Sequence, residues 1–152
     1  MHKDERFSKI IDIVSRKAAG LRVQETDLRY LFAKKHEMVK MAVDEIVFSV
    51  TDPQNYSCKL CNKKGLNKRG LYMHLIESHG KEIMKMVKDS MDFVDLSITL
   101  GTDYKTIKTV VERHNGKFYC KFCNKGFTKT GVYRHLFWKH KKDLNFITKN
   151  SD

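Results

Sequence analysis

The residues with the clearest chemistry are the four cysteines and four of the seven histidines. They form two groups with the same order and nearly the same spacing: Cys58, Cys61, His74 and His79, and Cys120, Cys123, His135 and His140. Two thiolates separated by two residues fit a tight turn, and two imidazoles separated by four residues lie near one face of a helix. Two thiolates and two imidazoles are a tetrahedral ligand set that Zn²⁺ prefers. The pattern predicts two structural zinc ions, because four protein ligands leave no coordination position open for catalysis.

The redox setting of the cysteines bears on this prediction. The apolar residues near the N-terminus are interrupted by Asp12, and the stretch is too short and too charged for a signal peptide or a membrane span. We therefore expect an intracellular, reducing compartment in which the protein is associated with DNA: the host cytoplasm for an archaeal or viral protein, or the nucleus for a eukaryotic one. Cysteines in such a compartment are metal ligands or free thiols more often than disulfides.

The positive charge is concentrated around the same cysteines. The chain has 152 residues and a net charge of +12, and 41% of its residues are hydrophobic, which is typical of a globular protein. Residues 51–80 and 118–152 carry net charges of +3 and +6, whereas residues 1–50 and 81–117 carry only +2 and +1. A basic protein of this kind favours a polyanionic partner, nucleic acid first of all.

Both groups also have apolar residues at characteristic distances from the ligands. In the first group these are Tyr56, Leu66 and Leu71, and in the second they are Phe118 or Tyr119, then Phe127 and Val132. With these residues, both blocks resemble zinc fingers with two Cys and two His, the ββα module, over about 50 residues. The gap between the last two apolar positions is four residues instead of the family's five, and Gly65 stands where the family has an aromatic residue. The start of each finger helix is therefore left open.

The resemblance implies binding of double-stranded DNA through the finger helices. The family's base-reading positions, counted back from the first histidine of each finger, correspond to Asn67, Arg69, Gly70 and Met73, and to Thr128, Thr130, Gly131 and Arg134. Arg134 is the best candidate to read a guanine, because a guanidinium can bond O6 and N7 together. Phosphate contacts are expected from Lys68, Tyr72, Lys129 and Tyr133. The glycines at the matching positions Gly70 and Gly131 indicate either that a neighbouring strand of DNA or protein approaches the backbone closely there, or that the two fingers share an ancestor by duplication.

The segments before the fingers have a helical, amphipathic pattern. Residues 94–113 predict a helix, a turn at Gly101 and a second helix capped by Asp103, which is similar to a helix-turn-helix. Four residues of the second helix are expected to face outward: Lys105, Thr106, Lys108 and Thr109. An earlier helix is indicated by Ile83, Met84, Met86 and Val87. The first 50 residues repeat this pattern at Ile10, Ile11, Ile13 and Val14, at Asp27 and Leu28, and at Phe32, Val39, Ala42 and Val43. We infer an internal duplication, with a generic helical spacer as the alternative.

The predicted fold is therefore small, α+β and zinc-stabilised, with a small helical module before each of two ββα zinc fingers. Its parts are a helical module (1–50), a finger (51–80), a second helical module (81–117), a second finger (118–142) and a C-terminal tail or short helix (143–152). We expect Leu144, Phe146 and Ile147 to form that terminal helix, and Ile76, Phe137 and Trp138 to pack on a helical module or to form a dimer contact. His2, His36 and His114 are expected at the surface.

The predicted function is zinc-dependent binding of double-stranded DNA, with transcriptional regulation as the biological role. Two fingers cover only about 6 base pairs, so helical modules or homodimerisation would have to extend the site. An RNA-binding zinc-finger protein and a protein-interaction scaffold presenting Phe137 and Trp138 remain as alternatives. No carboxylate pair, nucleophile–base set or open metal site recommends an enzyme, and we expect neither a membrane partner nor a small-molecule substrate. The compact build is similar to short zinc-finger proteins of archaea and their viruses.

Overall fold

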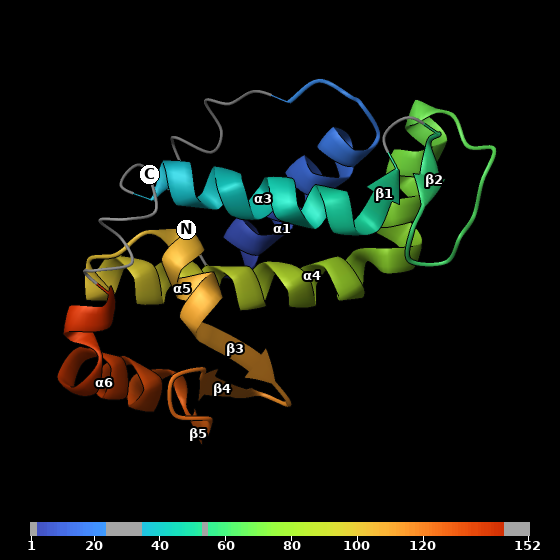
Figure 1. Ribbon diagram of the computed structural model, residues 1–152. Coiled ribbons are helices and arrows are strands. Elements are labelled where there is room, and N and C mark those ends of the chain that lie inside the picture. The colour runs from blue at the N-terminus through green and yellow to red at the C-terminus, as the bar shows by residue number, and fades with distance from the viewer. Residues whose placement is uncertain (1–2, 24–34, 53–54, 145–152) are drawn as a thin grey trace. The chain divides into compact units, whose positions relative to one another are not determined.

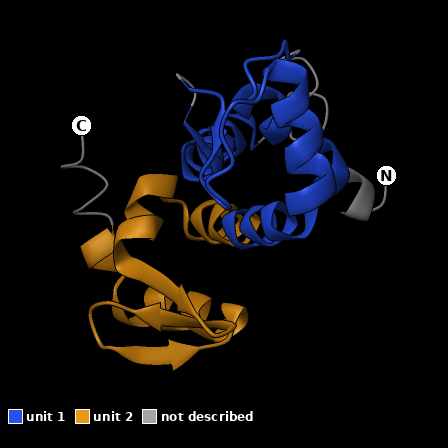
Figure 2. Ribbon diagram, turned by 90° about the vertical axis from the view of Figure 1, so that its right-hand side faces the viewer, with its two compact units in different colours: residues 1–90 blue, residues 91–152 orange. Residues whose placement is uncertain are grey.

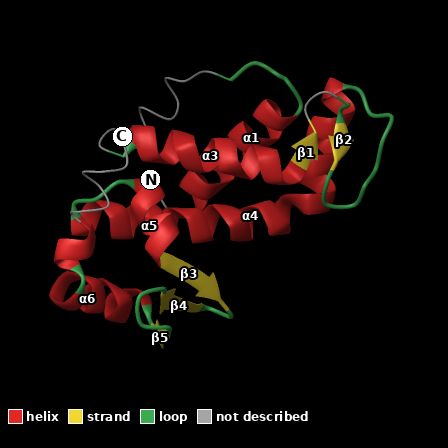
Figure 3. Ribbon diagram, in the orientation of Figure 1, coloured by secondary structure: helices red, strands yellow, loops and turns green. Residues whose placement is uncertain are grey.

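The computed structural model describes residues 3–23, 35–52 and 55–144 (Figure 1). Its elements are α1 (Lys3–Ala18), α3 (His36–Val50), β1 (Thr51–Asp52), β2 (Ser57–Cys58), α4 (Lys68–Leu100), α5 (Tyr104–Val110), β3 (Val111–His114), β4 (Lys117–Cys120), β5 (Lys125–Phe127) and α6 (Lys129–Lys139). Figure 3 shows mostly helix with short strands, so the predicted mixed α+β class is confirmed. The chain divides into two compact units, unit 1 (residues 1–90) and unit 2 (residues 91–152), and the division falls within α4 (Figure 2).

The core of unit 1 is formed where α1 and α3 lie side by side. The two helices bury the apolar residues that the sequence pattern singles out, with Ile10 and Val14 on α1 and Val39, Ala42 and Val43 on α3 all fully buried. An amphipathic helix gains most of its stability from burying this face against a neighbour. The helical prediction for these segments is therefore confirmed, while Asp27, Leu28 and Phe32 lie outside the described residues.

Helix α4 is longer than the sequence pattern suggests. The helix of the first finger does not end near His79 but continues through Gly80 to Leu100, for 33 residues. A glycine inside a helix costs roughly 1 kcal/mol relative to alanine. Leu75, Ile83 and Val87 are fully buried along α4, and burial of such a face offsets that cost. The expected boundary between residues 80 and 81 therefore falls inside one helix.

The predicted turn and second helix after α4 are present, but the helix is short. Gly101 has a φ of +68°, and the Asp103 side chain accepts a hydrogen bond from the Thr106 backbone N–H at 2.7 Å, which caps α5. Lys105, Lys108 and Thr109 are exposed as predicted. The prediction for Thr106 is wrong, because its side chain is buried. Thr106 lies four residues before the buried Val110, so both residues are on the buried face of α5.

Residues 111–113, expected in a helix, belong to strand β3 (Val111–His114) instead. This strand pairs with β4 in antiparallel register, Val111 opposite Cys120, and β4 pairs in turn with β5. The hairpin turn is Asn115-Gly116, where both residues have a positive φ, 52° and 79°. Asn-Gly is the dipeptide that favours a two-residue hairpin, so this signal in the sequence could have predicted the strand. The expected boundary between residues 117 and 118 falls inside β4.

Several smaller expectations concern single apolar side chains. Ile76 and Ile11 of α1 both line a groove of about 870 Å³ in unit 1. Trp138 is 77% exposed, so it does not pack on the helical segments of its own unit. Residues 141–144 are helical and Leu144 is buried, whereas Phe146 and Ile147 lie outside the described residues. None of the helices within the described ranges is long and apolar enough to cross a membrane.

Candidate metal centres and finger surfaces

Each of the two predicted ligand groups is assembled into a compact cluster. Within each cluster, the four ligand atoms lie within 4.8 Å of one another. The Sγ of Cys61 lies 3.2 Å from the Nε2 of His74, and the Sγ of Cys123 lies 3.2 Å from the Nε2 of His140. The edges of a tetrahedron with Zn–S and Zn–N bonds of ordinary length are about 3.3–3.8 Å. The clusters thus have nearly the dimensions of a tetrahedral metal site, and each could hold one ion.

The protonation chemistry of the ligands also fits a metal. Burial raises the pKa of the Cys58 and Cys120 thiols, so a neighbouring cation is needed to favour their thiolate forms. Burial, together with the charge of the second histidine, lowers the pKa of His74 and of His135. Neutral imidazole is the form that binds a metal. The Nε2 atom of His79 is buried, as expected for an atom that faces an ion.

The turn between the two cysteines has the same backbone in both fingers. Two backbone N–H groups of the turn donate to the first thiol, from Leu60 and Cys61 to Cys58 and from Phe122 and Cys123 to Cys120. The next residue is an asparagine with a positive φ, 63° at Asn62 and 56° at Asn124. Its N–H donates to the carbonyl of the first cysteine at 2.8 and 2.7 Å. Asparagine tolerates this left-handed conformation better than most residues, so the Cys-x-x-Cys-Asn sequence itself favours the turn.

A carboxylate supports the second histidine of each cluster, a feature that sequence reasoning missed. Nδ1 of His79 lies 2.8 Å from Oε1 of Glu82, and Nδ1 of His140 lies 3.2 Å from Oδ2 of Asp143. A proton held on Nδ1 by the carboxylate leaves the Nε2 lone pair for the metal and fixes the plane of the ring. The signal in the sequence is an acidic residue three positions after the second histidine in both fingers.

Removing these carboxylates is expected to weaken metal binding. We predict that Glu82→Ala lowers the metal affinity of the first cluster about 10- to 100-fold, and that Asp143→Ala does the same at the second cluster. The affinities can be measured by competition with a chelator at fixed pH. Glu77→Ala is the matched control, because Glu77 is an exposed acid on the same helix with no assigned role at the cluster. Unchanged affinity in Glu82→Ala would show that the carboxylate does not orient the ligand.

The finger helices start at the same place in both fingers, which resolves the question that the shortened spacing left open. The Asn67 side chain accepts a hydrogen bond from the Gly70 N–H at 2.7 Å, and Thr128 accepts one from the Gly131 N–H at 3.0 Å. Both are N-cap interactions. A Cβ added at Gly70 or Gly131 would lie only 2.9 or 3.1 Å from the capping oxygen. The close approach at these glycines is therefore made by the finger's own cap.

The small apolar core of each finger matches the prediction in part, because Tyr56, Leu66 and Phe127 are only half-buried. Leu71 and Val132 are fully buried, and Phe118 is buried while Tyr119 is half-buried, which decides between the two aromatic candidates in the second finger. The Phe127 ring stacks on the His135 ring, with 4.6 Å between centroids. Tyr119 instead covers Gly126 on the neighbouring strand, where a Cβ would approach its ring to 2.8 Å.

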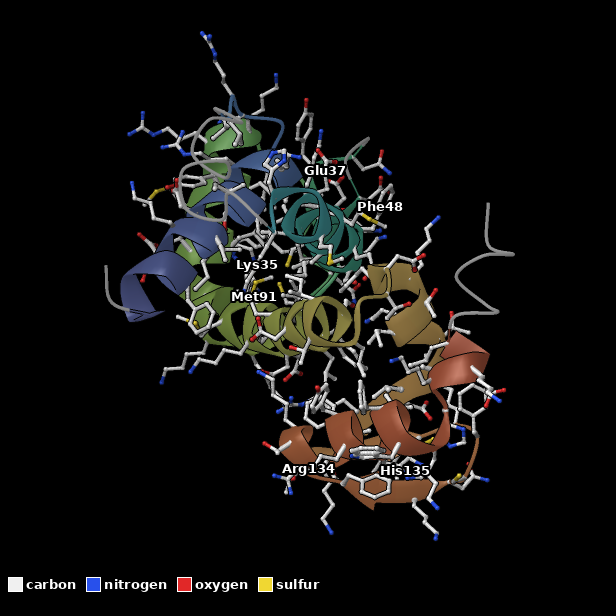
Figure 4. All side chains as sticks on the ribbon, turned by 90° about the vertical axis from the view of Figure 1, so that its left-hand side faces the viewer. Lys35, Glu37, Phe48, Met91, Arg134 and His135 are labelled. Atoms are coloured by element: carbon white, nitrogen blue, oxygen red, sulfur yellow. The ribbon has the colours of Figure 1, made fainter. Side chains whose placement is uncertain are left out.

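The residues predicted to contact DNA fall into two groups. Some make contacts within their own unit. Asn67 and Thr128 cap helices, the Tyr72 hydroxyl donates to Asp12, and the Lys129 ammonium donates to Asp92 and Asp95 at 3.1 and 3.0 Å. Among the remaining residues, Lys68, Arg69, Met73, Thr130 and Arg134 are exposed to solvent, while Tyr133 is half-buried near the Phe137 ring. Figure 4 shows Arg134 projecting from α6. The predicted set therefore includes side chains that already have partners within the protein.

No known protein family, curated protein or solved structure matches this chain. The assignment of the site therefore rests on the geometry of the clusters and on the chemistry of their ligands.

Proposed function

We propose that the protein is a zinc-dependent, sequence-preferring binder of double-stranded DNA that acts as a transcriptional regulator. The observation that supports this most is that each metal-binding finger has one arginine on the exposed face of its helix. On α4, Arg69 and Met73 are four residues apart, and on α6 the corresponding pair is Thr130 and Arg134. Residues four apart share a helix face, so each finger presents the same two positions. An exposed arginine there can bond the O6 and N7 of a guanine.

Zinc is the ion that we assign to both clusters. A set of two thiolates and two imidazoles at tetrahedral distances suits Zn²⁺ better than the hard cations, which prefer oxygen ligands. Each ion would be structural, because all four of its positions are filled by side chains. The zinc would hold the finger helix against its hairpin, and the helix would then present its arginine in a fixed orientation.

The charge of the fingers supports a nucleic-acid partner. Lys68 and Arg69 on the first finger and Arg134, Lys139 and Lys141 on the second are exposed. Lysine and arginine side chains that neutralise phosphates release condensed counterions, which contributes binding free energy independent of sequence. We expect the affinity to fall steeply as the salt concentration rises.

We propose further that the two fingers and the segments before them arose by duplication. In both halves a helix leads directly into a strand that pairs with the first cysteine, Thr51 with Cys58 and Val111 with Cys120. The residue before each strand accepts the same backbone hydrogen bond, from Lys59 to Val50 and from Lys121 to Val110, both at 2.9 Å. Such a repeat would place two similar reading helices in one chain.

The proposal is tested by selecting bound sequences from a random pool of duplex DNA in the presence of excess single-stranded RNA. Enrichment of a short motif is expected, together with loss of binding when zinc is removed. Recovery of RNA binding with no duplex enrichment would favour an RNA-binding protein instead. Absence of any nucleic-acid binding by the zinc-loaded protein would contradict the proposal.

Arg134→Ala is expected to weaken binding to the selected duplex by about 1–3 kcal/mol and to relax the preference at one base pair. Affinities for the selected site and for duplexes mutated at each position measure both effects. Lys142→Ala is the control, because loss of an exposed cation should weaken all duplexes about equally. An equal loss across all duplexes in Arg134→Ala would make Arg134 a phosphate contact and not a base contact.

A further inference from the structure

The most exposed of the large apolar side chains in the described part of the chain is the indole of Trp138, at 77%. It lies between the two histidine ligands of the second finger, on α6. Tryptophan is among the residues with the most apolar surface to bury, so leaving it in water carries a free-energy cost. Such a side chain, when it is surrounded by polar groups, commonly marks a binding surface.

The position of Trp138 on the helix links it to the base-reading arginine. Thr130, Arg134 and Trp138 follow one another at intervals of four residues, which puts them on one face of α6. The first two are exposed positions of the proposed reading face, and Trp138 extends that face by one further turn. A ligand that binds Arg134 and extends along α6 can therefore also contact the indole of Trp138.

The neighbours of Trp138 hold it in place without covering it. The Phe137 ring meets the indole edge-on, with 5.2 Å between centroids and an interplanar angle of 88°. Phe137 is in turn fixed by the Tyr133 ring at 6.0 Å and by the Lys141 ammonium, which lies 4.8 Å from the Phe137 centroid. The indole is thus supported by one edge contact while most of its surface is accessible to a ligand.

The positively charged side chains around Trp138 favour a negatively charged ligand. Arg134, Lys139, Lys141 and Lys142 are all exposed on the same short segment, and Asp143, the acid within it, is bound to the His140 imidazole. An aromatic side chain among cations matches a partner that has both flat apolar groups and negative charge. Unpaired nucleobases on a phosphate backbone have this combination, and they stack on exposed tryptophan with little dependence on sequence.

We propose that Trp138 is a stacking site for an unpaired base, so that the second finger binds DNA where a duplex adjoins single-stranded nucleotides. This inference rests on the proposed duplex binding, which supplies the contact at Arg134. The indole then stacks on a base that is no longer paired, one helical turn beyond the duplex contact. A flush duplex offers such a surface only at its terminal base pair, whereas an overhang or an internal loop offers it directly.

The experiment uses the zinc-loaded full chain and one selected duplex. The duplex is prepared fully paired, with a three-nucleotide single-stranded overhang at either end, or with an internal loop. Because Trp138 is the one tryptophan in the sequence, all tryptophan emission reports this site. We expect tighter binding to at least one unpaired form and quenching of the emission by that form. Trp138→Ala should lose about 5- to 150-fold in affinity for it and keep its affinity for the paired duplex, and Trp138→Phe should retain part of the gain.

Phe48→Ala is the matched control, since Phe48 is an aromatic side chain of unit 1 that is 68% exposed (Figure 4), and its loss should change neither affinity. If the paired duplex binds with the expected sensitivity to Arg134→Ala but no unpaired form binds more tightly or quenches the emission, the stacking inference is overturned and the proposed function stands. If no DNA binds, the proposed function itself fails. Tighter binding to single-stranded RNA, or a change from dimer to monomer in Trp138→Ala, would assign the surface to another partner and also overturn the inference.

Discussion

Removal of the metal is expected to unfold both fingers and to abolish DNA binding. In small zinc fingers the metal contributes about 10–16 kcal/mol, which matches or exceeds the whole stability of an ordinary domain. Each finger here buries few apolar side chains of its own, so no other interaction in it is of comparable size. Circular dichroism and amide hydrogen exchange before and after addition of EDTA, followed by return of Zn²⁺, measure the loss and its reversibility. Retained protection in residues 117–139, or retained DNA binding, would contradict the structural role of the metal.

The two units should respond to this loss differently. In unit 1, the buried contacts between α1 and α3 come from residues outside the finger, such as Ile10, Val14 and Val43. In unit 2, much of the core comes from the finger itself, including Phe118 and Leu136. The double variant C58S/C61S should therefore lose protection in residues 55–79 while α1 and α3 stay protected.

The corresponding variant of the second finger, C120S/C123S, should lose protection across β3, β4, β5, α5 and α6. Lys121→Ser is the control for this variant, because it changes an exposed residue between the two cysteines and leaves all four ligands in place. Equal protection of α1 and α3 from hydrogen exchange in C58S/C61S, C120S/C123S and Lys121→Ser would confirm that unit 1 has a core of its own. Loss of α1 and α3 in C58S/C61S would mean that the finger also stabilises them.

Phe118→Ala is expected to destabilise unit 2 by about 3–5 kcal/mol. The Phe118 ring is buried on the central strand of the three-stranded sheet and meets the Phe93 ring edge-on at 6.1 Å. The Arg113 guanidinium lies 4.7 Å from the Phe118 ring centroid, and Arg113 also pairs with Asp92. Alanine would leave a cavity and remove both ring contacts. In a unit of 62 residues, this loss is a large part of the total stability.

The effect can be measured by urea unfolding followed by hydrogen exchange, which separates the two units. Phe48→Ala is the control of the same residue type, because the Phe48 ring is mostly in water and its removal should change stability by at most about 0.5 kcal/mol. The exchange rates of α1 and α3 should be the same in Phe118→Ala as in the parent protein. A loss below about 1 kcal/mol in Phe118→Ala would show that β4 is not the centre of the unit 2 core.

Local interactions account for most of what the sequence predicts correctly. The ligand groups are identified by spacing alone, because a turn between two cysteines and a helix between two histidines are local structures. Asp103 is recognised as a cap for the same reason, since its side chain bonds a backbone N–H only three residues away. The buried faces of α1 and α3 follow from the helical period of their apolar residues. At each of these places, neighbouring residues in the sequence are also neighbours in space.

The errors arise where distant or competing contacts decide the outcome. The expected boundary after Gly80 is wrong, because α4 continues through this residue with its apolar face buried. Residues 111–114 could continue a helix, but β3 forms because β4 offers a full set of backbone partners across the Asn115-Gly116 turn. Tyr72 and Lys129 stay predicted phosphate contacts, and the structure adds that each bonds an acid far along the chain, Asp12 and Asp92 respectively.

The sequence by itself therefore determined the chemistry of the two clusters, the charge that surrounds them and the helical faces before them, because these depend on residue type and local period. Only the tertiary structure decided where the elements end, which polar side chains are already bound within a unit, and that Trp138 remains in water. Most of those outcomes depend on the free energy of contacts between residues far apart in the chain, which a local pattern of residues does not contain. The exception is strand β3, which the Asn115-Gly116 turn signals locally.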